Sequence, residues 1–389
     1  MNLPCRHVTG SRRCVRAVHA ACYLQEADVL GNHSRCRPPL LSLDRLLKHV
    51  REFFRITPSN ADHRPAIRIA IGVAVPLLTL LAIGRVDLSI FAVLGAFTGV
   101  FGREEHHRER LAQQWRASVL LLLAVTAGLL TSRVGPPPGV IVACTAAVAG
   151  LGFVASGAGR LKPAGSFFYV FAYSAVAFMP SVAMPWQALA TSGASALVCL
   201  LLGVTGRTLP GHSTPWDREP RLPLSRSQHE ATRSEAWMHV GAVALAGVVA
   251  LLAGFGHSYW AMIASTVPLV GATMAHRIRR GLHRILGTAV GLTIAGVLLG
   301  LPLLSWQFIL IALGLQFCLE LFVTRNYALA QVFVTPLALI MTEVANPANP
   351  WLLIRDRGVE TVIGACVGIA LVLATSAFAT KRAATTVSA

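Results

Sequence analysis

The chain has 389 residues, of which 54% are hydrophobic and 13% are charged, and its mean hydropathy is +0.60. A soluble domain carries about 25% charged residues, so this composition leaves too little polar surface for an ordinary soluble enzyme. The formal net charge of +17 does not indicate nucleic-acid binding, because the basic residues lie between apolar runs and accompany no recognisable nucleic-acid-binding motif. We therefore expect an all-α integral membrane protein.

Residues 1–64 form a basic segment that we expect to lie in the cytoplasm. Its first forty residues lack the continuous apolar core of a signal peptide, and its cysteines lack the close spacing of a zinc site. Within 41–56, the apolar residues Leu43, Leu47, Val50 and Phe54 recur at helical spacing, and basic residues lie between them. This pattern predicts an amphipathic helix that lies on an anionic membrane surface or docks against the protein itself.

Apolar runs follow in two sets of six, which we predict to be two six-helix halves. The first half, 65–206, contains runs at about 66–83, 88–102, 117–134, 138–157, 165–180 and 186–206. Residues 207–238 are polar and rich in proline, which predicts a cytoplasmic linker. The second half, 239–379, contains runs at about 239–256, 258–275, 282–300, 303–323, 327–344 and 358–379, and is followed by a cytoplasmic tail at 380–389. Several runs are shorter than the ~20 residues of a comfortable membrane span.

The basic residues between the runs predict the orientation of the chain. If all the runs cross and the N-terminus is cytoplasmic, most of these residues fall in cytoplasmic connections. The external connections then hold Arg85, Arg133, Arg355 and Arg357. This distribution follows the positive-inside rule. It predicts a multi-pass protein of the inner or plasma membrane with both termini in the cytoplasm.

The two halves resemble each other in sequence. A shift of 169 positions places Ser89 on Ser258, Ala92 on Ala261, Gly102 on Gly271 and Arg108 on Arg277. Because six is an even number, both halves enter the membrane with the same orientation, which predicts parallel repeats related by a pseudo-twofold axis along the membrane normal. The ligand path of such a protein is expected at the seam between the halves, lined here by the 88–102 and 258–275 runs.

The same shift places Gly99 on Pro268, and both residue types weaken a helix. Helices interrupted at corresponding positions point to a transporter site, where freed carbonyl groups and half-helix ends meet a ligand. A kink that serves only packing is the alternative. Glycines spaced four residues apart predict close approach of helix backbones; they include Gly95 with Gly99 and Gly364 with Gly368.

Few ionisable residues lie inside the apolar runs. Glu320 is one of them, and an unpaired charge at the bilayer centre costs at least ~2.5 kcal/mol. We expect either that Glu320 exchanges a coupled proton or that it pairs with Arg325. A basic loop is predicted before the ninth run, with Arg277, Arg279, Arg280, His283 and Arg284. Arg277, Arg280 and Arg284 are predicted to gather organic anions at the inner mouth, unless the loop only sets topology and contacts lipid headgroups.

Aromatic and amide groups suit planar organic ligands, whose rings stack while a polar group is hydrogen-bonded. We predict Asn326 and Tyr327 to be polar contacts on the substrate path. Tyr259 and Trp260 begin a run, which is typical of the interfacial aromatic belt. Adjacent histidines at 106 and 107 lie in a charged hydrophilic loop and are interpreted as solvated, so neither a metal site nor a cofactor is predicted.

Several motifs lie in the second half. They are Tyr259-Trp260-Ala261-Met262, Pro268 with Gly271-Ala272-Thr273, the segment from Arg280 to Thr288, Arg325-Asn326-Tyr327-Ala328, Thr335-Pro336, and the segment from Arg357 to Gly364. Together they resemble the fusaric acid resistance (FUSC) family, and this resemblance adds Arg325, Thr335 and Pro336 to the expected substrate path. The first half has the same layout with diluted motifs, since Phe91 replaces the tryptophan and Gly99 the proline.

The resemblance implies a twelve-helix inner-membrane protein related to aromatic acid exporters, and more distantly to plant malate-permeable anion channels. Members are associated with proton-linked efflux of aromatic or other hydrophobic carboxylic acids. The sequence departs from the family's pattern in two ways. The linker is short, where many members have a large cytoplasmic domain, and no envelope-spanning partner is encoded in this chain, so we do not expect coupling to one.

We therefore expect no enzyme but a resistance-type exporter of small organic anions of the aromatic carboxylate type, coupled to protons. A passive organic-anion channel and a non-transporting membrane accessory protein are the alternatives. The expected partners are small organic anions, protons and the lipid bilayer, without nucleic acid, and the sequence is compatible with a homo-oligomer.

Overall fold

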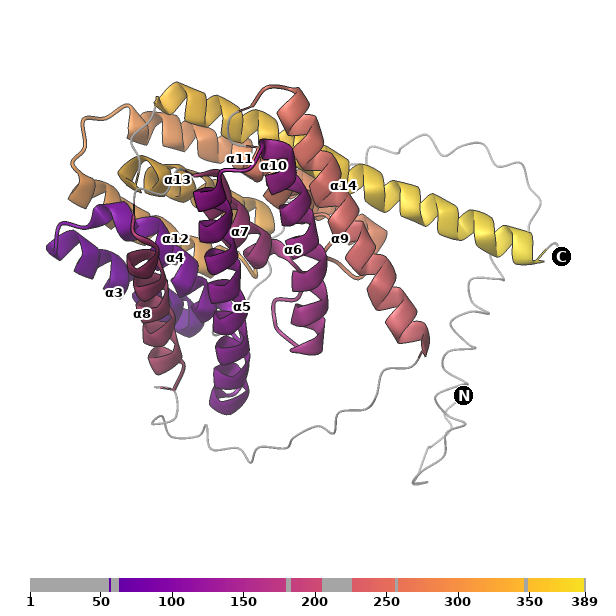
Figure 1. Cartoon of the computed structure of the whole chain (residues 1–389), viewed down its shortest axis with the longest axis horizontal. Coiled ribbons are helices and arrows are strands. Elements are labelled where there is room, and N and C mark those ends of the chain that lie inside the picture. Colours follow the sequence, from indigo (N-terminus) through magenta and orange to yellow (C-terminus); the bar gives the residue numbers. More distant parts are fainter. Residues whose placement is uncertain are drawn as a thin grey trace, which may run out of the picture. The chain divides into compact units, whose positions relative to one another are not determined.

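A computed structural model describes Ile56 and residues 63–179, 183–204, 226–255, 258–345 and 349–387. The predicted amphipathic helix at 41–56 and most of the predicted linker lie outside these residues. Within them the chain forms twelve α-helices and two short 3-10 helices, and no strand (Figure 1).

The helices fall into two sets, one on each side of residues 205–225. The first helix set comprises α3 (His63–Ala82), η2 (Val86–Leu88), α4 (Ser89–Ala96), η3 (Phe97–Val100), α5 (His107–Val134), α6 (Pro138–Ala158), α7 (Phe167–Phe178) and α8 (Pro185–Val204). The second helix set comprises α9 (Arg226–Leu252), α10 (Tyr259–Ser265), α11 (Met274–Leu299), α12 (Ser305–Phe322), α13 (Tyr327–Ala345) and α14 (Pro350–Val387). Every predicted apolar run overlaps one of the α-helices, and α5, α9, α11 and α14 begin 8–13 residues before their runs.

Nine of the described helices are long and apolar enough to cross a membrane, by length and composition alone. The other three, α4, α7 and α10, have 8, 12 and 7 residues, whereas a crossing takes about 20. None of these three is long enough to cross by itself, so the crossing of their runs stays a prediction. In α4 the helix tightens into the 3-10 turn η3, and α10 ends before Pro268, because proline disfavours helical backbone at the preceding residue.

Three predicted connections are partly helical. α9 begins at Arg226, so residues 226–238 of the expected linker belong to a helix. α11 begins at Met274, so the basic residues expected in a loop lie on the first turns of a long helix. α14 begins at Pro350, which places Arg355 and Arg357 inside a helix instead of an external connection.

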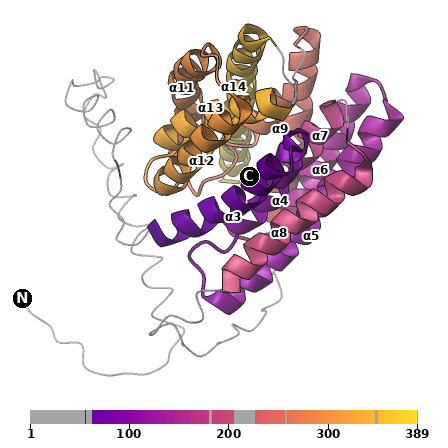
Figure 2. The same ribbon diagram turned by 90° about the vertical axis from the view of Figure 1, so that its left-hand side faces the viewer.

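The two helix sets pack in a corresponding way. In the first set α8 contacts α3, α4 and α5, and α7 contacts α5 and α6. In the second set α14 contacts α9, α10 and α11, and α13 contacts α11 and α12. The sets meet through α3 against α12 and α6 against α9, with smaller contacts of α4 with α13 and α7 with α10. Figure 2 shows α11–α14 gathered on one side of the helices of the first set, with α3 beside α12.

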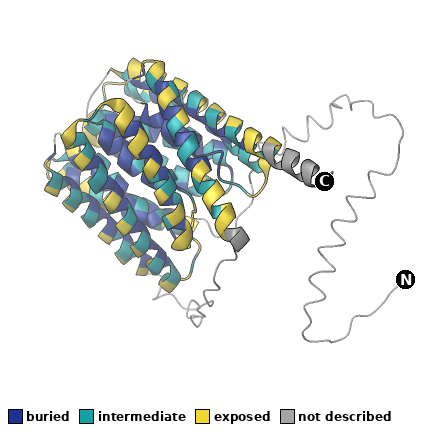
Figure 3. Ribbon diagram, turned by 45° about the vertical axis from the view of Figure 1, so that its right-hand side comes forward, coloured by how far each residue is buried: buried dark blue, intermediate teal, exposed yellow. Residues whose placement is uncertain are grey.

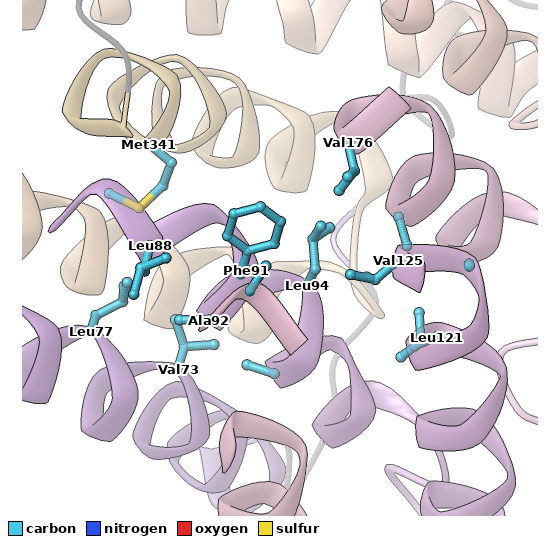
Figure 4. Close-up of a cluster of buried hydrophobic side chains, with 14 of the residues drawn as sticks. Val73, Leu77, Leu88, Phe91, Ala92, Leu94, Leu121, Val125, Val176 and Met341 are labelled. Atoms are coloured by element: carbon cyan, nitrogen blue, oxygen red, sulfur yellow. The ribbon is translucent and has the colours of Figure 1, made fainter. Parts of the chain in front are cut away.

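Apolar side chains from both helix sets form a shared core. Leu88 and Phe91, beside and on α4, approach Met341 of α13, as Figure 4 shows, and all three belong to one buried cluster. In Figure 3 the buried residues lie between the helices and the exposed ones on their outer faces. Those outer faces carry large apolar side chains such as Leu151 and Leu201, as expected of helices that face lipid.

Candidate functional site

Gly99 and Pro268 both lie buried at the ends of short helices, where the sequence predicted interruptions. A Cβ atom at Gly99 would lie 3.2 Å from Cys199 Sγ on α8. A Cβ atom at Gly368 on α14 would lie 2.9 Å from Pro268 Cγ. Each interruption therefore packs against the last helix of its own set, as the packing interpretation expects, and contact with a ligand stays a prediction.

Glu320 on α12 is paired with Arg103, from the segment between η3 and α5. The Arg103 Nη1 to Glu320 Oε2 distance is 2.6 Å, and the two side chains are 9% and 5% exposed. Arg103 Nη2 also donates to the Glu320 carbonyl oxygen at 2.6 Å, and Gln316 Nε2 donates to Glu320 Oε1 at 3.0 Å. The expected pairing with Arg325 is not the one formed, because packing of α3 against α12 brings the Arg103 segment to Glu320. This ion pair joins the two helix sets.

The three arginines predicted at the inner mouth, Arg277, Arg280 and Arg284, lie in different surroundings. Arg277 Nη2 donates to Glu235 Oε1 at 2.7 Å, and its Nε donates to the Gly271 carbonyl at 2.9 Å. The Arg280 guanidinium carbon lies 4.5 Å from the centre of the Tyr327 ring, a cation–π contact. The structure thus brings Arg280 and Tyr327, both predicted on the path, together.

Four other predicted path residues lie on or beside α13. Asn326 Oδ1 accepts hydrogen bonds from the backbone N–H groups of Ala328 and Leu329, at 2.9 and 3.2 Å, and so caps the helix. Thr335 Oγ1 donates to the carbonyl oxygen of Gln331, and Pro336 is the next residue of the same helix. Arg325 lies in the turn between α12 and α13. Their roles toward a ligand stay predictions.

Arg284 lies in the interior of the protein instead of at an exposed mouth, with 2% of its surface accessible. Its Nη1 donates to Gln331 Oε1 at 2.8 Å, and its guanidinium carbon lies 6.0 Å from the centre of the Phe167 ring on α7. Its Nε has no hydrogen-bond acceptor among the described residues. A buried guanidinium with free donor capacity thus faces an aromatic ring of the other helix set.

Two charged residues of α14 that the sequence did not place on the path are also buried. Arg357 is 1% exposed, and its guanidinium carbon lies 3.7 Å from the centre of the Trp260 ring. Its Nε and Nη1 atoms have no hydrogen-bond partner in the described part of the chain. Glu360 is fully buried; its carboxylate lies beside the backbone N–H groups of Trp260 and Ala261, but no hydrogen bond of good geometry is formed within the described residues.

A sequence signal for these two residues existed. Arg357 and Glu360 are three positions apart, so both lie on one face of a helix, at the start of an apolar run. Ionisable side chains on an apolar helix are functional-site candidates by default. The assignment of Arg357 to an external connection concealed it.

Tyr259 and Trp260 are 1% and 4% exposed, so the prediction that they form an interfacial belt is wrong. The reason is that α10 is short and packs between α9 and α14. The Trp260 ring meets the edge of Phe171, with ring centres 5.5 Å apart, and the Tyr259 ring lies 6.3 Å from Phe178. Both partners belong to α7, so aromatic rings of the two helix sets meet beside Arg284 and Arg357.

The hydrophilic loop with the adjacent histidines makes a surface ion pair. Glu105 Oε1 lies 2.7 Å from Lys162 Nζ, and this hydrogen bond raises the pKa of the Lys162 ammonium group. Within the described residues there is no group of three or more histidine, cysteine or acidic side chains placed to hold a metal ion.

Comparison with known proteins finds a family match in the second helix set, over the segment that contains Arg284, Arg357 and Glu360. Residues 245–371 match the family model described as fusaric acid resistance protein-like, which confirms the recognition made from the second-half motifs. The chain is similar to the uncharacterized membrane protein YvaC of Bacillus subtilis (strain 168), with 31% identity over 139 residues. That match spans 35% of this chain and 22% of the length of YvaC. No solved structure matches. The chain is thus a multi-pass membrane protein whose second helix set is similar to the fusaric acid resistance protein-like model over residues 245–371.

Proposed function

We propose that this chain is a membrane transporter that exports small organic anions of the aromatic carboxylate type from the cytoplasm, coupled to protons. It resides in the inner or plasma membrane with both termini in the cytoplasm. The family match over residues 245–371 and the nine long apolar helices among the described residues support a transporter of this type. The positive-inside distribution of the basic residues supports the orientation.

In this proposal the two helix sets are parallel repeats, and the substrate passes at the seam between them. The corresponding packing within the sets supports this arrangement: α8 with α3, α4 and α5 matches α14 with α9, α10 and α11. The contacts between the sets also correspond, since α3 with α12 matches α9 with α6. The shift of 169 positions relates Gly99 and Cys199 to Pro268 and Gly368, which make the same packing contact.

The observation that carries the proposal is the burial of ionised groups where the helix sets meet. The Arg103–Glu320 ion pair joins the sets in the interior, and Arg284 faces Phe167 across the same boundary. Apolar residues at such places are often as stable as a buried ion pair or more so, so the fold alone does not demand these charges. Charges that partner each other across a movable boundary suit a protein that alternates access to a central site and moves protons and anions.

Reconstitution into liposomes tests the proposal. Purified protein is incorporated into vesicles, and uptake of radiolabelled benzoate is measured with a pH gradient of either sign and without one. We expect uptake against the benzoate gradient that reverses direction when the pH gradient is reversed. Net flux that follows only the benzoate gradient would identify a passive anion channel. No protein-dependent flux of any aromatic acid would refute transport and favour an accessory role.

A further inference from the structure

The interior of the second helix set holds a cluster of buried charged residues beside Asp356, which is 4% exposed and paired with Arg355. Its members are Arg284 on α11 and Arg357 and Glu360 on α14, each at most 2% exposed. Arg284 and Arg357 are close enough for their like charges to repel, and Glu360 attracts Arg357 without a hydrogen bond of good geometry. A guanidinium cannot shed its proton to escape burial, so the buried donors of Arg284 and Arg357 need acceptors.

The hydrogen-bond donors of the cluster that have no acceptor indicate which kind of ligand would bind there. Arg357 Nε and Nη1 and Arg284 Nε are buried without a hydrogen-bond partner among the described residues. Buried donors in native proteins are nearly always satisfied, so an unsatisfied set calls for a specific explanation. A carboxylate has two acceptor oxygens and matches the fork of a guanidinium. Of the Arg284 donors, Nη1 is already satisfied by the amide oxygen of Gln331 at 2.8 Å, and Nε is the one without an acceptor among the described residues.

Packing of the helices does not require these charges. The first helix set makes the corresponding contact of α4 with α8, and the shift of 169 positions relates Arg357 and Glu360 to Ala188 and Thr191. It also relates Trp260 to Phe91. The corresponding helix pair of the first set, α4 with α8, therefore packs with an alanine, a threonine and a phenylalanine at these three positions. The charged version in the second set carries a desolvation penalty that a structural role does not explain.

We propose that Arg284 and Arg357 bind the carboxylate of an aromatic carboxylic acid, and that Trp260 packs against its ring. This inference rests on the proposed function and names its substrate site. The aromatic rings of Trp260, Phe167 and Phe171 lie beside the guanidinium groups, so a flat apolar body next to the carboxylate meets ring faces and edges.

Binding to the purified full chain tests this site. The probes are benzoate and its uncharged analogue benzamide, with affinity measured by calorimetry and by thermal stabilisation in detergent. We expect wild-type protein to prefer benzoate by about tenfold or more, since charge-assisted bidentate bonds are the strongest available. The double variant R357A/E360T installs the residues of the first helix set and should lose this preference. Arg284→Gln should lose it as well, and Trp260→Phe should weaken benzoate binding severalfold.

A matched control separates the site from arginine burial in general. Arg116→Lys alters a partly buried arginine of the first helix set whose Nη1 donates to the Gly159 carbonyl at 3.0 Å, and it should bind benzoate as wild type does. If R357A/E360T does not fold, Arg357→Lys replaces it, because lysine keeps the charge and lacks the fork. The same loss of preference is expected.

The outcomes distinguish this site from the transport proposal. If folded R357A/E360T and Arg284→Gln proteins prefer benzoate over benzamide as strongly as wild type does, the proposed site is wrong. If these variants also transport benzoate at the wild-type rate, the site is wrong but the export proposal stands. Binding that depends on both arginines, in a protein that moves no benzoate, would establish the site and refute export. Wild-type protein that binds benzoate and benzamide equally would overturn the site outright.

Discussion

Arg103 and Glu320 form a buried ion pair between the two helix sets, with 2.6 Å between Nη1 and Oε2. Arg68 of α3 adds to this contact by donating from Nη2 to the Arg103 carbonyl oxygen at 3.1 Å. The pair thus fixes the segment after η3 against α12 where the two sets meet. Removal of one charge leaves the other buried without compensation, whereas removal of both does not.

A double-mutant cycle on this pair should show strong coupling. We expect Arg103→Met to lower the free energy of unfolding by about 3–5 kcal/mol, and the double variant R103M/E320L to recover most of that loss. Thermal unfolding in detergent measures each variant. Glu235→Gln is the control, because its partner Arg277 and Glu235 itself are 20% and 32% exposed, and such pairs contribute about 0–1 kcal/mol. Additive effects of R103M and E320L would contradict a structural pair.

Glu320→Gln separates a proton-coupling role from a structural one. Glutamine retains the size of glutamate and accepts hydrogen bonds from Arg103 and Gln316, but it does not exchange a proton. We expect the variant to insert and fold, although with lower stability because Arg103 keeps its charge, while benzoate flux in liposomes loses its dependence on the pH gradient. Flux at a series of internal and external pH values measures this. An unaltered pH dependence would leave Glu320 as a structural partner of Arg103.

Close packing of α10 against α14 should make Gly364 intolerant of a side chain. A Cβ atom there would overlap the carbonyl oxygen of Ala261, which is backbone and cannot turn away. We expect Gly364→Ala to destabilise the protein by about 1–3 kcal/mol, the usual range for overpacking. Gly193→Ala on α8 is the control, since a Cβ atom there meets nothing within 4 Å. The folded fraction after detergent extraction is the readout, and equal fractions for the two variants would contradict the packing.

Replacement of Pro268 tests whether the break after α10 serves transport or only packing. Pro268→Ala removes a ring that packs against Gly281 and Gly368. If the break is functional, benzoate flux per folded molecule should fall severalfold while the amount of folded protein changes little. Pro76→Ala, at a proline inside α3, should alter neither quantity by as much. Parallel loss of flux and folded protein in Pro268→Ala would assign the residue to packing.

The sequence alone determined the helical elements and their grouping. An apolar run in lipid has to satisfy its backbone groups internally, so runs of this length form helices whatever their partners. Each of the predicted runs overlaps a helix, and glycines such as Gly364 lie where backbones approach closely. The motifs of the second half, including the segment from Arg357 to Gly364, were sufficient to recognise the similarity to the family model that matches residues 245–371.

Tertiary structure decided which side chains are buried and which charges meet. Glu320 is 217 positions from Arg103, and no pattern along one helix specifies a partner on another. Tyr259, Arg284 and Arg357 resembled interfacial or connecting residues, because spacing gives the face of a helix on which a residue lies and not what covers that face. Their burial follows from the short α10, the long α14 and the aromatic side chains of α7, and only the packing of these helices brings the guanidinium groups beside aromatic rings.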